Sequence, residues 1–194
     1  MPEIIVPDGG STDGTVEAAN RAGATVIAAP RGRGSQLAAG AGAATGDWLL
    51  FLHADTRLVE GWRDAVAQFA AEGAGKAAAF RLVLDDDAPA ARRLERIVAW
   101  RCRVLALPYG DQGLLICRAL YDRVGGFRPL PLMEDVDIVR RLGRRRLVML
   151  DHAAVTSAAR YRRAGYLARP ARNLSCLALY FLGLPPRLIA RLYG

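Results

Sequence analysis

Cysteine is scarce in this 194-residue chain, and its three copies are odd in number and widely spaced. This pattern indicates neither a disulfide framework nor a zinc site, and it favours a reducing, cytoplasmic setting. The first residues show no basic segment ahead of a long apolar run, so no secretory signal is predicted. The longest apolar run, residues 177–184, is far short of the ~20 residues that span a bilayer.

Aromatic residues are also few, at 7%, and they are scattered along the chain. Because no helix-turn-helix pattern appears either, a nucleic-acid partner is not expected. What is present is a 52% hydrophobic and 24% charged composition with a mean hydropathy of +0.11. These values exclude an intrinsically disordered chain and a coiled coil, and they predict one globular domain.

The net charge of +8 is divided unevenly along the chain. Residues 1–90 hold 7 basic and 12 acidic residues, whereas residues 91–194 hold 20 basic and 7 acidic ones. A solvated basic face is the usual reason for such a run, and attraction to anionic lipid or to a nucleotide diphosphate is the sharper alternative. We therefore expect a domain over residues 1–165 and a basic, apolar helical tail over 166–194, packed on the domain or on a membrane surface.

Apolar runs and amphipathic segments alternate along the first 156 residues. The short β-branched or apolar runs predict strands at residues 3–6, 24–28, 47–52, 77–84, 114–117 and 147–156. The amphipathic segments predict helices at residues 11–22, 34–44, 56–71, 90–105, 118–124 and 133–142. This alternation indicates an α/β fold of Rossmann type, with a mixed, mostly parallel sheet flanked by helices.

Three short motifs carry polar groups to strand ends or helix starts. DGGSTDGT at residues 8–15 follows the first strand, where backbone N–H groups favour anions; the alternative is a glycine turn with a serine or threonine N-cap. HADT at residues 53–56 ends a buried strand, where Asp55 can hold a divalent cation against a diphosphate or simply cap a helix. MEDVD at residues 133–137 places three acids in one helical turn, which complements the helix dipole or turns one carboxylate into a cleft.

Taken together and in order, four segments resemble the family 2 glycosyltransferases of the GT-A fold: EIIVPDGGSTDGT, GDWLLFLHADT, GDQG and MEDVD. A bacterial subgroup of small members, in which HADT replaces the usual aspartate-x-aspartate, is most similar. The resemblance implies transfer of a sugar from a nucleotide diphosphate sugar to the hydroxyl of an unidentified acceptor, a lipid or a small molecule. It also implies inversion at the anomeric carbon and dependence on Mg²⁺ or Mn²⁺.

The same resemblance assigns roles to individual residues. Asp135 becomes the general base, Asp55 holds the metal and contacts the donor, and Asp8 contacts the nucleoside. Arg33 is a candidate for the donor phosphates. The acceptor side is expected to include Asp111, Gln112 and Glu134.

The resemblance also predicts an incomplete sheet, because the family opens with a strand and helix that precede the segment matched by residues 3–6. We therefore expect a missing central strand, a missing wall of the donor pocket, and association with a second copy through the exposed strand edges. The alternative function is a catalytically impaired remnant that acts as a binding or membrane-surface module, at the inner face of the cell membrane. A third hypothesis is a nucleotidyltransferase on a similar scaffold.

Overall fold

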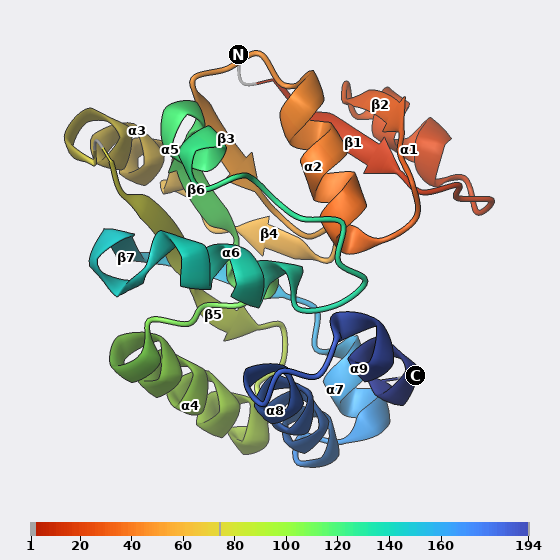
Figure 1. Cartoon of the computed structure of the whole chain (residues 1–194), viewed down its shortest axis with the longest axis vertical. Coiled ribbons are helices and arrows are strands. Elements are labelled where there is room, and N and C mark those ends of the chain that lie inside the picture. Colours follow the sequence, from red (N-terminus) through yellow and green to blue (C-terminus); the bar gives the residue numbers. More distant parts are fainter. Residues whose placement is uncertain (1–2, 74, 194) are drawn as a thin grey trace.

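The computed structural model describes residues 3–73 and 75–193, and it contains two sheets that are hydrogen-bonded separately (Figure 1). The smaller sheet pairs β1 (Ile5–Asp8) with β2 (Thr25–Ala28). The larger one has five strands in the order β3-β6-β5-β7-β4. Its strands are β3 (Trp48–Phe51), β4 (Thr56–Leu58), β5 (Ala77–Leu84), β6 (Leu114–Cys117) and β7 (Leu147–Thr156).

The mixed sheet is confirmed, but it is less parallel than the alternation of strands and helices predicts. β1 with β2 and β5 with β7 are parallel, whereas β3 with β6, β6 with β5, and β7 with β4 are antiparallel. Alternation of strands and helices predicts parallel pairing only where each connection returns the chain to the same end of the sheet. Here the connections into β4 and β6 bring these strands in from the opposite end.

Nine helices surround the sheets in the part of the chain that the structure describes. They are α1 (Thr15–Arg21), α2 (Arg33–Ala43), α3 (Trp62–Glu72), α4 (Pro89–Leu105), α5 (Arg118–Arg123), α6 (Glu134–Leu142), α7 (Ala159–Ala164), α8 (Ala168–Phe181) and α9 (Pro186–Tyr193). Two short 3-10 turns, η1 (Gly110–Gln112) and η2 (Arg144–Arg146), precede β6 and β7. No described helix has the length and hydrophobicity needed to span a bilayer.

Two predicted helices begin later than expected. α1 starts at Thr15 rather than at residue 11, because Gly14 is its N-cap, and the second case is α3. Residues 56–58 form β4 rather than the first turn of a helix, and α3 starts only at Trp62. Thr56 is drawn into the sheet because its hydroxyl lies 2.7 Å from that of Thr156 on β7. Gly61, with a φ of 81°, then turns the chain into α3.

The core lies on both faces of β5, the most buried strand. Residues 77–80 are fully inaccessible to solvent. On one side Leu82 and Leu84 pack against Leu94 and Val98 of α4. The largest cluster joins β6, α6 and the C-terminal helices, and Ile189 of α9 is completely buried in it. The basic tail therefore contributes side chains to the core.

The β1–α1–β2 unit is the least buried part of the fold. As the resemblance predicts, no described strand is hydrogen-bonded between β1 and β3. α1 has no buried residue. The unit is held mainly through α2, where Gln36 Nε2 donates to Pro7 O at 2.9 Å.

We predict that this unit opens more easily than the five-stranded sheet. Backbone amides of β1 and β2 should exchange with deuterium roughly a hundredfold or more faster than those of β5 and β7, because few buried contacts are broken when the small sheet opens. Hydrogen exchange followed by mass spectrometry measures this directly. Equal protection of both sheets would show instead that they open as one unit.

Candidate active site

A pocket of about 760 Å³, part of it open to solvent, lies where the ends of β3 and β7 meet η1 and the start of α6. Three aspartates and several arginines share its wall, so charges of both signs face one space. The lining includes Arg33, Asp55, Asp111, Asp135, Arg160 and Arg169. A cleft of this kind suits an anionic ligand accompanied by a cation.

Asp135, in the first turn of α6, is oriented by hydrogen bonds from two backbone N–H groups. Its Oδ2 accepts a hydrogen bond from Gly110 N–H at 2.8 Å, and its Oδ1 accepts one from Val136 N–H at 2.7 Å. A Cβ atom at position 110 would overlap His53 Nε2, so any larger residue there would have to displace the His53 ring. The GDQG segment thus fixes the direction of a carboxylate 25 residues away.

The three acids of MEDVD lie in three environments, although helical spacing alone places Glu134 and Asp137 on one face and only Asp135 on another. Asp137 is 2.7 Å from Arg141 Nη2 and 3.2 Å from Arg128 Nη1, so it stabilises the fold. Glu134 is 1% exposed and neither of its carboxylate oxygens has a hydrogen-bond partner. The only cation that forms an ion pair with it, among the described residues, is Arg33 at 3.8 Å.

Burial raises the pKa of Glu134 to about 7, and the nearby charge of Asp135 adds to the effect. Asp111 behaves similarly, since burial raises its pKa to about 6 while Arg101 opposes the shift and Asp135 reinforces it. Asp111 Oδ1 also lacks a hydrogen-bond partner. Two carboxyl groups beside Asp135 are therefore able to change protonation near neutral pH.

Gln112 lies behind the pocket wall rather than in it. The side chain is 1% exposed, its Nε2 donates to Phe80 O at 2.9 Å, and its Oε1 accepts from Arg101 Nη2 at 3.1 Å. With both ends of the amide engaged, Gln112 anchors η1 and thereby Asp111. Glu134 is likewise absent from the lining. Of the three residues expected on the acceptor side, only Asp111 reaches the pocket.

Asp55 and His53 flank the mouth of the pocket after β3. The Asp55 side chain is 34% exposed, and its Oδ2 lies 3.9 Å from Arg160 Nη2. Burial, with a contribution from Arg33, lowers the pKa of His53, so its imidazole is neutral at pH 7. The first residue of HADT therefore adds no positive charge beside the aspartate.

The carboxylates of the pocket fit a divalent cation only together with a bound ligand that supplies further oxygen atoms. In the described residues, no group of three or more His, Cys, Asp or Glu side chains is placed to hold a metal ion. Mg²⁺ and its analogues need just one or two carboxylates when substrate phosphates and water complete the shell. Asp55, with the unpartnered Oδ1 of Asp111 in the same pocket, meets that lesser requirement.

Asp8 is not part of the pocket lining. It ends β1 and closes a tight turn, accepting hydrogen bonds from Gly10 N–H at 3.0 Å and from the Ser11 hydroxyl at 2.5 Å. The Ser11 hydroxyl is the main reason that the pKa of Asp8 is lowered. Its carboxylate therefore organises the DGGS turn. The glycine turn of the structural alternative is present, but its serine or threonine N-cap is wrong, because α1 begins after Gly14 without a side-chain cap.

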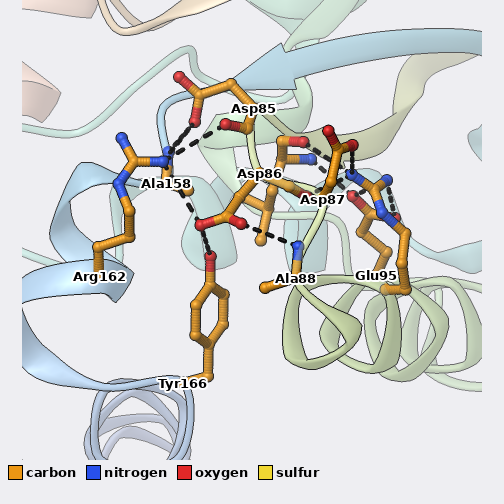
Figure 2. Close-up of polar contacts among 10 residues, drawn as sticks. Asp85, Asp86, Asp87, Ala88, Glu95, Ala158, Arg162 and Tyr166 are labelled. Atoms are coloured by element: carbon orange, nitrogen blue, oxygen red, sulfur yellow. Dashed lines mark hydrogen bonds and ion pairs between the residues drawn. The ribbon is translucent and has the colours of Figure 1, made fainter.

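The acidic loop, residues 85–87 after β5, holds α7 at the wall of the pocket (Figure 2). α7 carries Arg160 and Tyr161, which line the pocket. Asp85 accepts a hydrogen bond from Ala158 N–H at 2.5 Å. Asp86 accepts one from the Tyr166 hydroxyl at 2.7 Å and lies 3.4 Å from Arg162. These acids belong to none of the four motifs, and in the sequence only their charge signals that they would find basic partners.

Thr156 and Tyr109 also line the pocket and carry no recognisable motif. Thr156 is 5% exposed and its hydroxyl donates to Asp111 O at 3.0 Å. Tyr109 is covered by the guanidinium of Arg101, 3.5 Å from the ring centroid. Single polar residues at strand ends leave no pattern that a sequence could reveal.

Comparison with known proteins accounts for this arrangement. A family model described as glycosyl transferase family 2 matches residues 2–131. The chain belongs to glycosyl transferase family 2. The family and the glycosyltransferase domain predicted from the four motifs are thereby confirmed, whereas the HADT subgroup stays a prediction.

Solved structures agree with the GT-A fold. Glucosyl-3-phosphoglycerate synthase from Mycobacterium tuberculosis, in complex with Mn²⁺, UDP and glucosyl-3-phosphoglycerate, superposes with a TM-score of 0.61 at 21% identity over 95% of this chain and 70% of that one. Mannosyl-3-phosphoglycerate synthase from Rubrobacter xylanophilus gives 0.59 at 18% identity over 94% and 65%. At such identities the likeness establishes the fold. No curated protein matches this family 2 chain.

We predict that Glu134 makes the stability of the protein depend on pH. Its pKa rises from 4.5 in the unfolded chain to about 7 in the fold, so the wild type loses stability as pH increases through this window. Glu134→Gln does not show this loss. The unfolding free energy of the variant minus that of the wild type should therefore rise by about 3 kcal/mol between pH 4.5 and 8.

Urea unfolding at several pH values measures the difference. Exposed Glu72→Gln is the matched control and should run parallel to the wild type. Parallel curves for Glu134→Gln as well would contradict the prediction.

Proposed function

We propose that this family 2 chain transfers a sugar from a nucleotide diphosphate sugar to an acceptor hydroxyl with inversion, and that Asp135 is the general base. The observation that carries the proposal is the pocket itself, in which a backbone-oriented Asp135 faces Asp55 and two arginines. The glucosyl-3-phosphoglycerate synthase that shares this fold is in complex with UDP and Mn²⁺, which supports a uridine diphosphate donor as the first to test.

The donor is placed at the Asp55 side of the pocket. Arg33 and Arg160, 42% and 58% exposed, both line the pocket and would supply the positive charge that a diphosphate requires. Asp55 would hold Mg²⁺ or Mn²⁺, and the metal supplies charge stabilisation to the departing diphosphate. Asp8 and its turn would border the nucleoside at the end of β1.

Asp135 is suited to accept the acceptor's proton because its direction is fixed before any substrate binds. The acceptor oxygen forms a bond to the anomeric carbon as the bond to the diphosphate oxygen breaks on the opposite side. The hydroxyl proton passes to the Asp135 carboxylate, and the diphosphate leaves with the bonding electrons. One base on one face is sufficient for such an inverting displacement.

The acceptor is placed against η1. Asp111 faces the pocket and can donate or accept a hydrogen bond, depending on its protonation near pH 6. Gln112 and Glu134 would act on the acceptor indirectly, by anchoring η1 and by holding Arg33.

We predict that Asp55→Asn removes metal-dependent donor binding. The amide keeps the size of the side chain but loses the charge that a hard cation requires. Titration calorimetry with UDP-glucose, in the presence of Mn²⁺ or of a chelator, should show binding to the wild type only with metal and at least tenfold weaker binding to the variant. Exposed Asp64→Asn on α3 is the control and should bind as the wild type does. Metal-independent binding of equal strength would refute the assignment.

We predict that Asp135→Asn lowers kcat by about 10²–10⁴ while donor affinity stays within a few-fold of wild type. The amide oxygen can still accept the Gly110 N–H bond, so the loop keeps its place, but the amide takes up no proton. Single-turnover transfer from a labelled nucleotide sugar measures the rate, with exposed Asp122→Asn as control. An unchanged rate would overturn the role of Asp135, and release of pyrophosphate from a nucleoside triphosphate would overturn the reaction class.

A further inference from the structure

Large apolar side chains that face solvent gather on two stretches of the chain. One is the outer side of α4, with Ile97, Trp100, Val104 and Leu105 between 38% and 62% exposed. The other is the C-terminal helical region, with Leu167, Leu174, Phe181, Leu182, Leu188 and Leu192 between 46% and 87% exposed. Among the other described residues, only Ile4 is a large apolar side chain with comparable exposure. Such a concentration marks a contact surface rather than chance exposure.

The spacing of these residues places them in lines along their helices. Leu167, Leu174 and Phe181 are spaced seven residues apart. Seven residues make two helical turns less about 20°, so the three side chains lie nearly in line. Ile97 and Val104 repeat the same interval on α4. On α4 this exposed side is separate from the side that meets the core through Leu94 and Val98. On α8 the exposed side adjoins the buried Leu177, so the apolar surface continues outward from the core.

The two stretches adjoin each other. Tyr161 and Tyr166, at α7 and just before α8, pack against the buried cluster of α4 that contains Leu94 and Val98. The hydrogen bond from Tyr166 to Asp86 fixes this junction two residues before α8 begins. Figure 1 shows α4, α7, α8 and α9 together at one end of the molecule, away from β1 and β2. We refer to residues 97–105 and 167–192 as the apolar end.

The charge of these helices selects the kind of partner. Residues 159–193 contain seven arginines and no acidic residue, and α4 contains five arginines and a single acid, Glu95, which already pairs with Arg92. A second copy docked on this end would oppose arginine with arginine and offer no carboxylate in return. The occupant has to combine an apolar interior with an anionic surface.

We propose that the apolar end docks on membranes that contain anionic phospholipids. The outward leucines and Trp100 enter the boundary between head groups and acyl chains, and the surrounding arginines contact lipid phosphates. Arg169 and Asn173 of α8 line the catalytic pocket, so docking brings the pocket beside the head groups. This surface does not depend on the proposed catalytic roles.

Vesicle sedimentation tests the proposal with the full chain. The protein should sediment with vesicles of phosphatidylcholine mixed with phosphatidylglycerol, release progressively as salt is raised, and stay in solution with phosphatidylcholine alone. Failure to bind the mixed vesicles at low salt, or equal binding to both kinds, overturns it.

Two exposed apolar residues at the apolar end are compared with one outside it. Trp100→Ser and Leu174→Ser should each weaken binding to the mixed vesicles roughly tenfold. Ile4→Ser, at 55% exposure, is the matched control and should bind as the wild type does. Unchanged thermal melting shows that the variants are folded. Equal weakening by Ile4→Ser overturns the proposal.

Charge is tested with triple variants that lose the same number of arginines. Arg93→Ser/Arg96→Ser/Arg187→Ser removes exposed arginines of α4 and α9 and should weaken binding about a hundredfold, at roughly fivefold for each residue. Arg21→Ser/Arg63→Ser/Arg123→Ser, at exposed sites on α1, α3 and α5, should change it only a few-fold. Equal effects would contradict a specific surface. A dimer in light scattering that Leu174→Ser dissociates, without vesicle binding, would assign the apolar end to a second copy.

Discussion

The hydroxyl of Thr156 joins the segments that frame the pocket. It donates to Asp111 O, so its contact with the Thr56 hydroxyl must use the proton of Thr56. The carbonyl of the same residue accepts Asp85 N–H at 3.2 Å. One buried residue thereby holds the ends of β4 and β7, the η1 turn and the start of the acidic loop. The positions of Asp111 and α7 both depend on it.

That framework keeps like charges close together. Asp55, Asp111 and Asp135 line one pocket, and burial together with the charges of Asp135 and Asp55 raises the pKa of Asp111 to about 6. Arg160 lies 3.9 Å from Asp55, and the charge of Arg33 opposes the shift at Asp111. Binding a cation together with an anionic ligand would relieve this repulsion. A glycosyltransferase with its metal and nucleotide sugar bound is expected to be in that state.

The strands and helices that carry the motifs could be predicted from the sequence, because each motif follows a local pattern. That pattern is a strand that ends in a polar residue, or acids in the first turn of a helix. Asp135 and Asp137 are two residues apart, so on a helix they point in different directions whatever surrounds them. Gln112 was different, since its partners, Phe80 and Arg101, come from distant segments and turn a loop residue into a buried anchor. Thr56 was predicted as helical for the same reason: only its cross-strand partner, 100 residues away, makes it a strand.

Met133 shows how the core and the chemistry are linked. It adopts a φ of 66° immediately before the acids of α6, a left-handed conformation that costs a non-glycine residue roughly 1–2 kcal/mol. Leu132, Val136 and Met133 itself are buried in the main cluster, so packing holds the backbone in this conformation. The direction of Asp135 is thus maintained by the packing of apolar side chains around it. If Asp135 is the base proposed above, substitutions among these apolar residues alter turnover while every charged residue of the pocket stays the same.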